Sequence, residues 1–228
     1  MSYERSAPEG PTITNALLLF LTEELRQMGA IQRFLYGFEK LGDDVFFGDP
    51  LNVYEEANDS AFLRAVDNFQ TYISELILCI LTVYPQPFFG RKIDAELLFT
   101  NNSIEDLQKL VIDREVNDLT YKSVVDLEKF VSEKFGFYLF GSALQRARVK
   151  YLYDVRILIT HNRGIVNHRF LSANPKSKQV LKIRLHAPEC LRTTLYLKSV
   201  AIGIDQRAMG KFTFPSEMTV TKSELANV

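Results

Sequence analysis

The chain has no tryptophan, few cysteines and no long apolar run. Its 228 residues include only Cys79 and Cys190, without a Cys-x-x-Cys pair, which argues against a disulfide framework and a zinc site. The longest apolar runs, ALLLFL and LILCILTVY, are far short of the roughly 20 residues that span a bilayer. The first residues lack the order of a signal peptide. We therefore expect a soluble, cytoplasmic protein with no membrane partner, metal or other cofactor.

Several catalytic signatures are also missing. The sequence contains no GxSxG, GxGxxG or HExxH motif and no phosphate-binding P-loop, so readings as a serine hydrolase, dehydrogenase, metalloprotease or P-loop nucleotidase have no residues to support them. Asp43, Asp44 and Asp49 lie close together, but no histidine accompanies them and their spacing matches no calcium loop. We interpret these carboxylates as solvated acids.

Charge is distributed unevenly along the chain. Residues 1–145 contain 12 Lys/Arg against 23 Asp/Glu, whereas residues 146–228 contain 15 against 5. A basic half allows phosphate binding on one defined side of the protein. The alternative interpretation is that the two halves attract each other within one fold.

Hydrophobic periodicity predicts an all-α protein, a bundle of about five to seven helices with a short β-hairpin or strand near 180–186. We expect a loose leader at 1–11, one helical domain at 12–214 and a flexible tail at 215–228. Gly29 is a candidate break in the first helix, and 42–57 is expected to be a loop. The predicted helices cover approximately residues 16–41, 61–84, 103–119, 120–135, 144–163 and 189–211.

One stretch, residues 146–169, carries six Lys/Arg and two of the three histidines. The spacing of its apolar residues by three and four predicts one buried helical face, formed by Leu144, Ala147, Tyr151, Val155 and Leu158. A different face carries Arg148, Arg156, Thr160 and Arg163. The helix is expected to end near His161, Asn162 and Gly164, because glycine tolerates the left-handed turn that follows a helix.

Arg156, four intervening residues and then His161-Asn162-x-Gly164-Ile165-Val166-Asn167 resemble the Arg-x4-6-His motif of HEPN domains (higher eukaryotes and prokaryotes nucleotide-binding). The preceding segments LTVYPQPF, SIEDLQKLVIDREVNDL and SVVDLEKFVSEKFGFYL follow an order similar to that of uncharacterised bacterial HEPN proteins. The resemblance covers approximately residues 58–172. Ile157 departs from the pattern, because many active members have a polar residue, often asparagine, directly after the arginine.

This resemblance implies a metal-independent endoribonuclease in which two motifs meet across a homodimer, in a toxin or phage-defence setting with an antitoxin or nucleotidyltransferase partner. Attack by the RNA 2′-hydroxyl would need a general acid/base, His161, and a cation at the scissile phosphate, Arg156. Asn162 would orient the histidine or the RNA. The expected contacts to flanking RNA are Arg148, Lys150, Thr160, Arg163, His168 and Arg169.

Two other functions fit the same residues. A non-catalytic HEPN module would bind RNA, a nucleotide or a protein, and Ile157 favours this alternative. A purely structural helical scaffold would use Arg156 as an ion-pair partner for an acid from residues 1–145.

Overall fold

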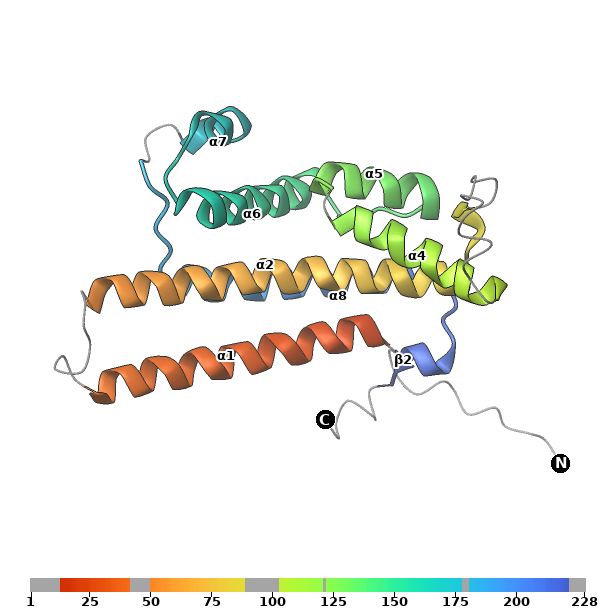
Figure 1. The fold of residues 1–228 in the computed structure, drawn as a ribbon, viewed down its shortest axis with the longest axis horizontal. Helices are drawn as coiled ribbons and strands as arrows, with labels where there is room; N and C mark the ends of the chain where they lie inside the picture. The colour runs from red at the N-terminus through yellow and green to blue at the C-terminus, as the bar shows by residue number, and fades with distance from the viewer. Residues whose placement is uncertain (1–12, 42–49, 89–102, 121, 178–180, 222–228) are drawn as a thin grey trace.

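The computed structural model describes residues 13–41, 50–88, 103–120, 122–177 and 181–221, and it confirms an all-α bundle (Figure 1). None of the described helices has the length and apolarity needed to cross a membrane. The helices are α1 (Asn15–Leu41), α2 (Pro50–Val83), α4 (Ile104–Thr120), α5 (Val124–Phe135), α6 (Ala143–Asn162), α7 (His168–Ala173) and α8 (Ala187–Lys211), with short 3-10 turns η2 (Gln86–Phe88), η3 (Pro175–Ser177) and η4 (Ser216–Met218).

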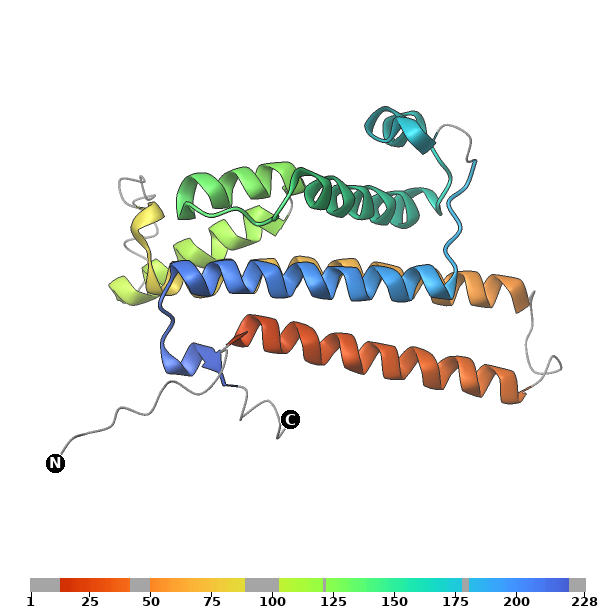
Figure 2. The same ribbon diagram turned by 180° about the vertical axis from the view of Figure 1, so that it is seen from behind.

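Helix α2 is the central element of the bundle. It packs against α8, which runs in the same direction, and against α1, which runs in the opposite direction (Figures 1 and 2). Helices α4, α5 and α6 form a further layer on the side of α2 that is opposite α1. This double coverage explains why the sequence of α2 is apolar nearly all round. Its fully buried side chains include Phe62, Phe69, Tyr72, Ile73, Leu76, Ile77, Ile80 and Leu81.

The start of α2 corrects the second half of the expected loop at 42–57 and the expected helix start near residue 61. The helix begins 11 residues earlier, at Pro50, and proline is well suited to a first helical turn. Glu55 of the added turns forms ion pairs with Lys182 at 3.3 Å and with Arg184 at 3.2 Å. A local sequence pattern does not reveal long-range contacts of this kind. Asp43, Asp44 and Asp49 lie outside the described residues.

Helix α1 runs through Gly29 without the break that the glycine suggested. Helical spacing predicts that Leu17, Phe20, Leu25 and Met28 lie on the buried side of this helix. Leu17 and Phe20 are buried, whereas Leu25 is 66% exposed and Met28 is also exposed. The buried residue on this turn is Glu24, whose carboxyl oxygen accepts a hydrogen bond from Asn68 Nδ2 at 3.0 Å. The same spacing predicts that Phe34, Leu35 and Phe38 continue the buried side, but these three lie outside the described side chains.

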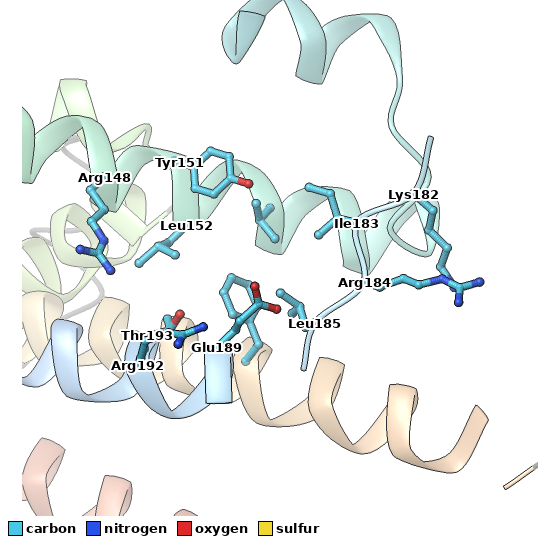
Figure 3. Close-up of a pocket in the computed structure, with 12 residues that line it drawn as sticks. Arg148, Tyr151, Leu152, Lys182, Ile183, Arg184, Leu185, Glu189, Arg192 and Thr193 are labelled. Atoms are coloured by element: carbon cyan, nitrogen blue, oxygen red, sulfur yellow. The ribbon is translucent and has the colours of Figure 1, made fainter. Parts of the chain in front are cut away.

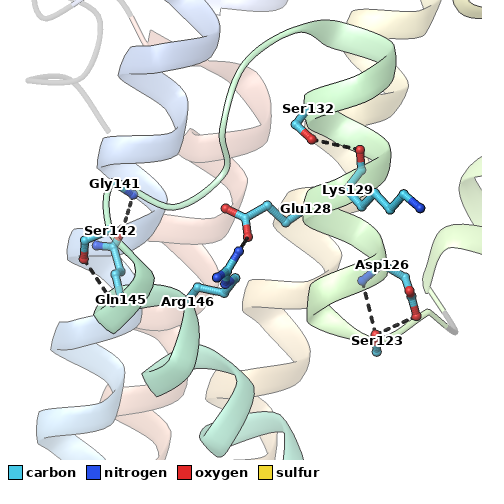
Figure 4. A network of polar contacts seen from close by, with 9 residues as sticks. All are labelled: Ser123, Asp126, Glu128, Lys129, Ser132, Gly141, Ser142, Gln145 and Arg146. Atoms are coloured by element: carbon cyan, nitrogen blue, oxygen red, sulfur yellow. Dashed lines mark hydrogen bonds and ion pairs between the residues drawn. The ribbon is translucent and has the colours of Figure 1, made fainter.

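Helices α4 and α5 start where serine hydroxyls accept backbone N–H groups, as caps do. Ser103 accepts from Asp106 at 3.0 Å, and Ser123 accepts from Asp126 at 3.2 Å, so the second start lies three residues after the predicted Thr120. Gly136 ends α5 with a left-handed φ of 68°. Glu128 of α5 then accepts from Arg146 of α6 at 2.9 Å, which joins the two helices (Figure 4).

The sheet lies at the chain ends rather than near 180–186. β1 (Ile13–Thr14) pairs antiparallel with β2 (Thr219–Val220), so the part of the expected flexible tail at 215–220 is instead folded onto the body. Residues 181–186 are extended, but their pairing is one isolated bridge between Ile165 and Lys182. This segment holds the turn after α6 against the start of α8.

Candidate functional site

Helix α6 carries the motif, and its buried face differs from the predicted one. Ser142 caps its start by accepting from Gln145 N at 3.1 Å. Leu144 is 81% exposed, and Ala147 and Tyr151 are also exposed. Val155 and Leu158 are buried as predicted. The rest of the buried stripe is formed by Val149, Leu152 and Ile159, which face the bundle.

Arg156 projects from α6 toward α2. Its Nε donates a hydrogen bond to Oδ1 of Asp67 at 2.9 Å, and 32% of the arginine side chain is exposed. This contact is the acid partner from residues 1–145 that the scaffold alternative requires. Two roles are compatible with it, since a carboxylate both orients a guanidinium and offsets part of its charge.

The Arg156–Asp67 pair lines a polar pocket of about 530 Å³ between α2, α4 and α6. We call it the acidic pocket, because its walls also include Glu75 and Asp113.

The hydroxyl of Tyr153 is buried and forms no hydrogen bond with any residue that the structure describes. Burial raises the pKa of Tyr153, an effect that the charge of Arg156 opposes, so this hydroxyl is a neutral group close to the ion pair.

The end of α6 is a left-handed turn made by two residues. Arg163 has a φ of 53° and Gly164 a φ of 77°, and their N–H groups donate to Ile159 O at 3.0 Å and Leu158 O at 3.3 Å. The sequence predicted the glycine but not the arginine, which adopts a conformation that costs a non-glycine residue about 1 kcal/mol. The turn leaves His161 exposed and Asn162 half-buried on the last turn of the helix.

Arg156 and His161 point in different directions from α6. Five helical residues correspond to about 140° of rotation and about 7.5 Å of rise. Arg156 faces the acidic pocket, whereas His161 lies on an exposed face that it shares with Ile157, one turn earlier. A phosphate contacted by both side chains would therefore have to reach around the helix or lie between two protein copies.

The other predicted RNA contacts are dispersed. Lys150 pairs with Asp154 at 2.6 Å, and the Arg148 guanidinium lies 4.0 Å from the centre of the Tyr196 ring. Arg148 is about 20 Å from His161 along α6. His168 and Arg169 are exposed on α7, which stands away from the helical layers (Figure 1). Thr160 and Arg163 are exposed and lie within two residues of His161 in the sequence, so of the predicted contacts these two are nearest to the histidine along the chain.

Comparisons of the chain with protein-family models, curated proteins and solved structures returned no match. Within the described ranges, no group of three or more His, Cys, Asp or Glu side chains is arranged to hold a metal ion. What Arg156 and His161 do is therefore inferred from the chemistry of these residues and their positions.

Sequence reasoning missed two features near the motif. Asp67 gave no local signal, because it is one acid among many on α2 and its partner is 89 residues away. The sequence predicts a strand near 180–186, but the position of its basic residues beside α6 and α8 depends on the turn at Gly164. Ile183 N donates to Gly164 O at 2.9 Å and fixes that position.

Proposed function

We propose that this protein is a metal-independent endoribonuclease of the HEPN type that acts as a homodimer. The observation that carries the proposal is the exposure of His161 at the end of α6, with Thr160 and Arg163 next to it. Histidine exchanges protons near neutral pH and arginine binds phosphate through several donors. The resemblance of residues 156–167 to the HEPN motif supplies the reaction class.

In this reaction the RNA 2′-oxygen attacks the adjacent phosphorus while the bond to the 5′-oxygen of the next nucleotide breaks. One His161 takes the proton of the 2′-hydroxyl, and the His161 of a second copy gives a proton to the leaving 5′-oxygen. Arg156 stabilises the charge that builds on the phosphate oxygens, and Asn162 orients the imidazole or the RNA. Thr160, Arg163 and Arg169 contact flanking phosphates.

Exposed apolar side chains next to His161 support a second copy at this position. Ile157 shares the exposed face of α6 with His161, and Ile165 is exposed immediately after the turn. Apolar groups at the centre of a contact contribute most of its stability, whereas charged groups suit its rim. In this account Ile157 is a dimer contact, which gives a physical reason for an apolar residue directly after the motif arginine.

A second candidate function is a non-catalytic module that binds RNA, a nucleotide or a protein. The ion pair between Arg156 and Asp67 favours it, because the guanidinium already has an anionic partner. Incubating the purified protein with a defined RNA in EDTA separates the two functions. Cleavage that leaves 2′,3′-cyclic phosphate ends supports the nuclease, whereas salt-sensitive binding without cleavage supports the module and ends the nuclease proposal.

A further inference from the structure

A second pocket lies on a different side of α6 from Arg156. It is bounded by α6, the start of α8 and the extended segment 181–186 (Figure 3). Its volume is about 510 Å³, which is within the usual range of small-molecule sites. We call it the basic pocket, because its walls carry Arg148, Lys182, Arg184 and Arg192.

The floor of the basic pocket is apolar and comes from three elements. Helix α2 contributes one aromatic ring, helix α6 contributes two aliphatic side chains, and the extended segment contributes two more. A flat apolar ligand body that covers such a floor removes hydrocarbon surface from water. The floor residues are Phe62, Leu152, Val155, Ile183 and Leu185.

The charges on the walls are divided between two ends of the pocket. Lys182 and Arg184 lie at one end, where both pair with Glu55. At the other end Arg148 extends from α6 toward α8, where Arg192 lies (Figure 3). The two arginines therefore approach one space from two different helices.

The ring of Tyr196 orients the Arg148 guanidinium by lying 4.0 Å beneath it, a cation–π contact that leaves the edge of the guanidinium able to donate hydrogen bonds. Glu189 is the acid of this pocket wall, and its carboxylate accepts from the backbone N–H of His186 at 3.1 Å. Glu189 is the carboxylate among the pocket's lining residues, while Glu55 and Asp59 lie close to Lys182 from outside the lining. The four cations therefore outnumber these three carboxylates by one.

We propose that the basic pocket binds a nucleoside monophosphate, a ligand that combines a phosphate monoester with a flat aromatic base. The dianionic phosphate is held by Arg148 and Arg192, whose forked donors match phosphate oxygens. The ring packs on the apolar floor next to Phe62 and Leu185. The pocket is separate from Arg156 and His161, so its ligand is bound whether or not the protein cleaves RNA.

Calorimetric titration of the whole protein with adenosine 5′-monophosphate tests this site, with adenosine and inorganic phosphate as partial ligands. We expect one binding site per chain, with at least about tenfold weaker binding of each partial ligand, because each lacks one half of the contacts. Arg192→Gln and Arg148→Met, which keeps an apolar stem over Tyr196, should each weaken binding about tenfold. Arg26→Gln, at an exposed position on α1, should bind like the wild type.

Loss of affinity in both pocket variants, with unchanged circular dichroism spectra and unchanged binding by Arg26→Gln, supports the site. The proposal is overturned if adenosine 5′-monophosphate does not bind, or if adenosine binds equally well. It is also overturned if the Arg148→Met and Arg192→Gln double variant binds like the wild type. Titration of His161→Ala keeps the two proposals distinguishable, because this variant should bind the nucleotide normally even though we expect it to cleave RNA far more slowly.

Discussion

Asp67 on α2 and Arg156 on α6 are separated by 89 residues in the chain, and their side chains meet at a hydrogen bond of 2.9 Å. Both side chains are partly exposed, at 48% and 32%, so solvent screens the pair and limits its effect on stability to about 1 kcal/mol. The significance of the contact therefore lies in how it positions and partly neutralises the guanidinium.

Asp67→Asn should strengthen RNA binding. The amide oxygen still accepts from Arg156 Nε, but it carries no negative charge, so more of the arginine's charge is directed at phosphate. We expect RNA affinity to rise about two- to fivefold and the free energy of unfolding to change by less than about 1 kcal/mol. Fluorescence anisotropy with a labelled RNA measures the first quantity and urea denaturation the second. Weaker RNA binding would show that Arg156 does not contact RNA.

Glu24 should make stability depend on pH near neutrality. Burial raises its pKa from 4.5 to about 7, and the hydrogen bond from Asn68 opposes this shift. The folded protein therefore binds the proton more tightly than the unfolded chain. The resulting stabilisation is complete below pH 4.5 and is lost as the pH rises through about 7. At about 1.4 kcal/mol per pKa unit, the loss amounts to about 3 kcal/mol.

Urea denaturation at a series of pH values tests this dependence. We expect Glu24→Gln to gain stability relative to the wild type as the pH rises from 5 to 8, by about 2–3 kcal/mol. Glu23→Gln, at the exposed neighbouring position, should show the same pH profile as the wild type. Parallel profiles for all three proteins would contradict the assignment of a neutral buried carboxyl to Glu24.

The fold class and most helix ends could be predicted from the sequence because they depend on local chemistry. Ser103 and Gly136 begin and end helices through contacts within a few residues. The start of α2 could not, since Glu55 of its first turns is held by Lys182 and Arg184. Helical periodicity alone also does not show which of two overlapping apolar stripes of α6 is buried, because that depends on where α2 lies.

In the candidate site too, features that depend on local sequence were predictable and features that depend on distant segments were not. The sequence predicted that His161 and Gly164 lie at a helix end, and the structure has them there. It did not identify which acid of residues 1–145 pairs with Arg156, or the walls of the basic pocket. These depend on segments that approach only in the folded chain, as residues 181–186 do through Gly164. The reaction itself stays a prediction that rests on the motif.

Gly164→Ala should destabilise the turn that holds both candidate sites. An added Cβ would lie 2.7 Å from the carbonyl oxygen of Ile183, at a position with a φ of 77°. We expect a loss of about 1–3 kcal/mol and faster hydrogen exchange in residues 181–186. Gly210→Ala is the matched control, because nothing lies within 4 Å of its added Cβ. Equal stability of the two variants would contradict the tight approach at Gly164.

Asp205 should be essential for holding the N-terminal strand on the bundle. It is 1% exposed, and it accepts from the backbone N–H of Thr14 at 3.1 Å and from the Thr14 hydroxyl. Asp205→Ala leaves both donors buried without an acceptor, at a cost of about 2–4 kcal/mol. Asp205→Asn keeps one acceptor oxygen and should cost less. Thermal unfolding compares the stabilities of the wild type and the two variants. An alanine variant as stable as the wild type would refute this role.

The rate of RNA cleavage by His161→Ala in EDTA, compared with that of His186→Asn, tests the central claim most directly. His186 is an exposed histidine that precedes α8, and asparagine is a favourable residue at such a position. The account predicts that the wild type and His186→Asn cleave at similar rates, whereas His161→Ala is slower by about 100-fold or more. Cleavage by His161→Ala at the wild-type rate would contradict it.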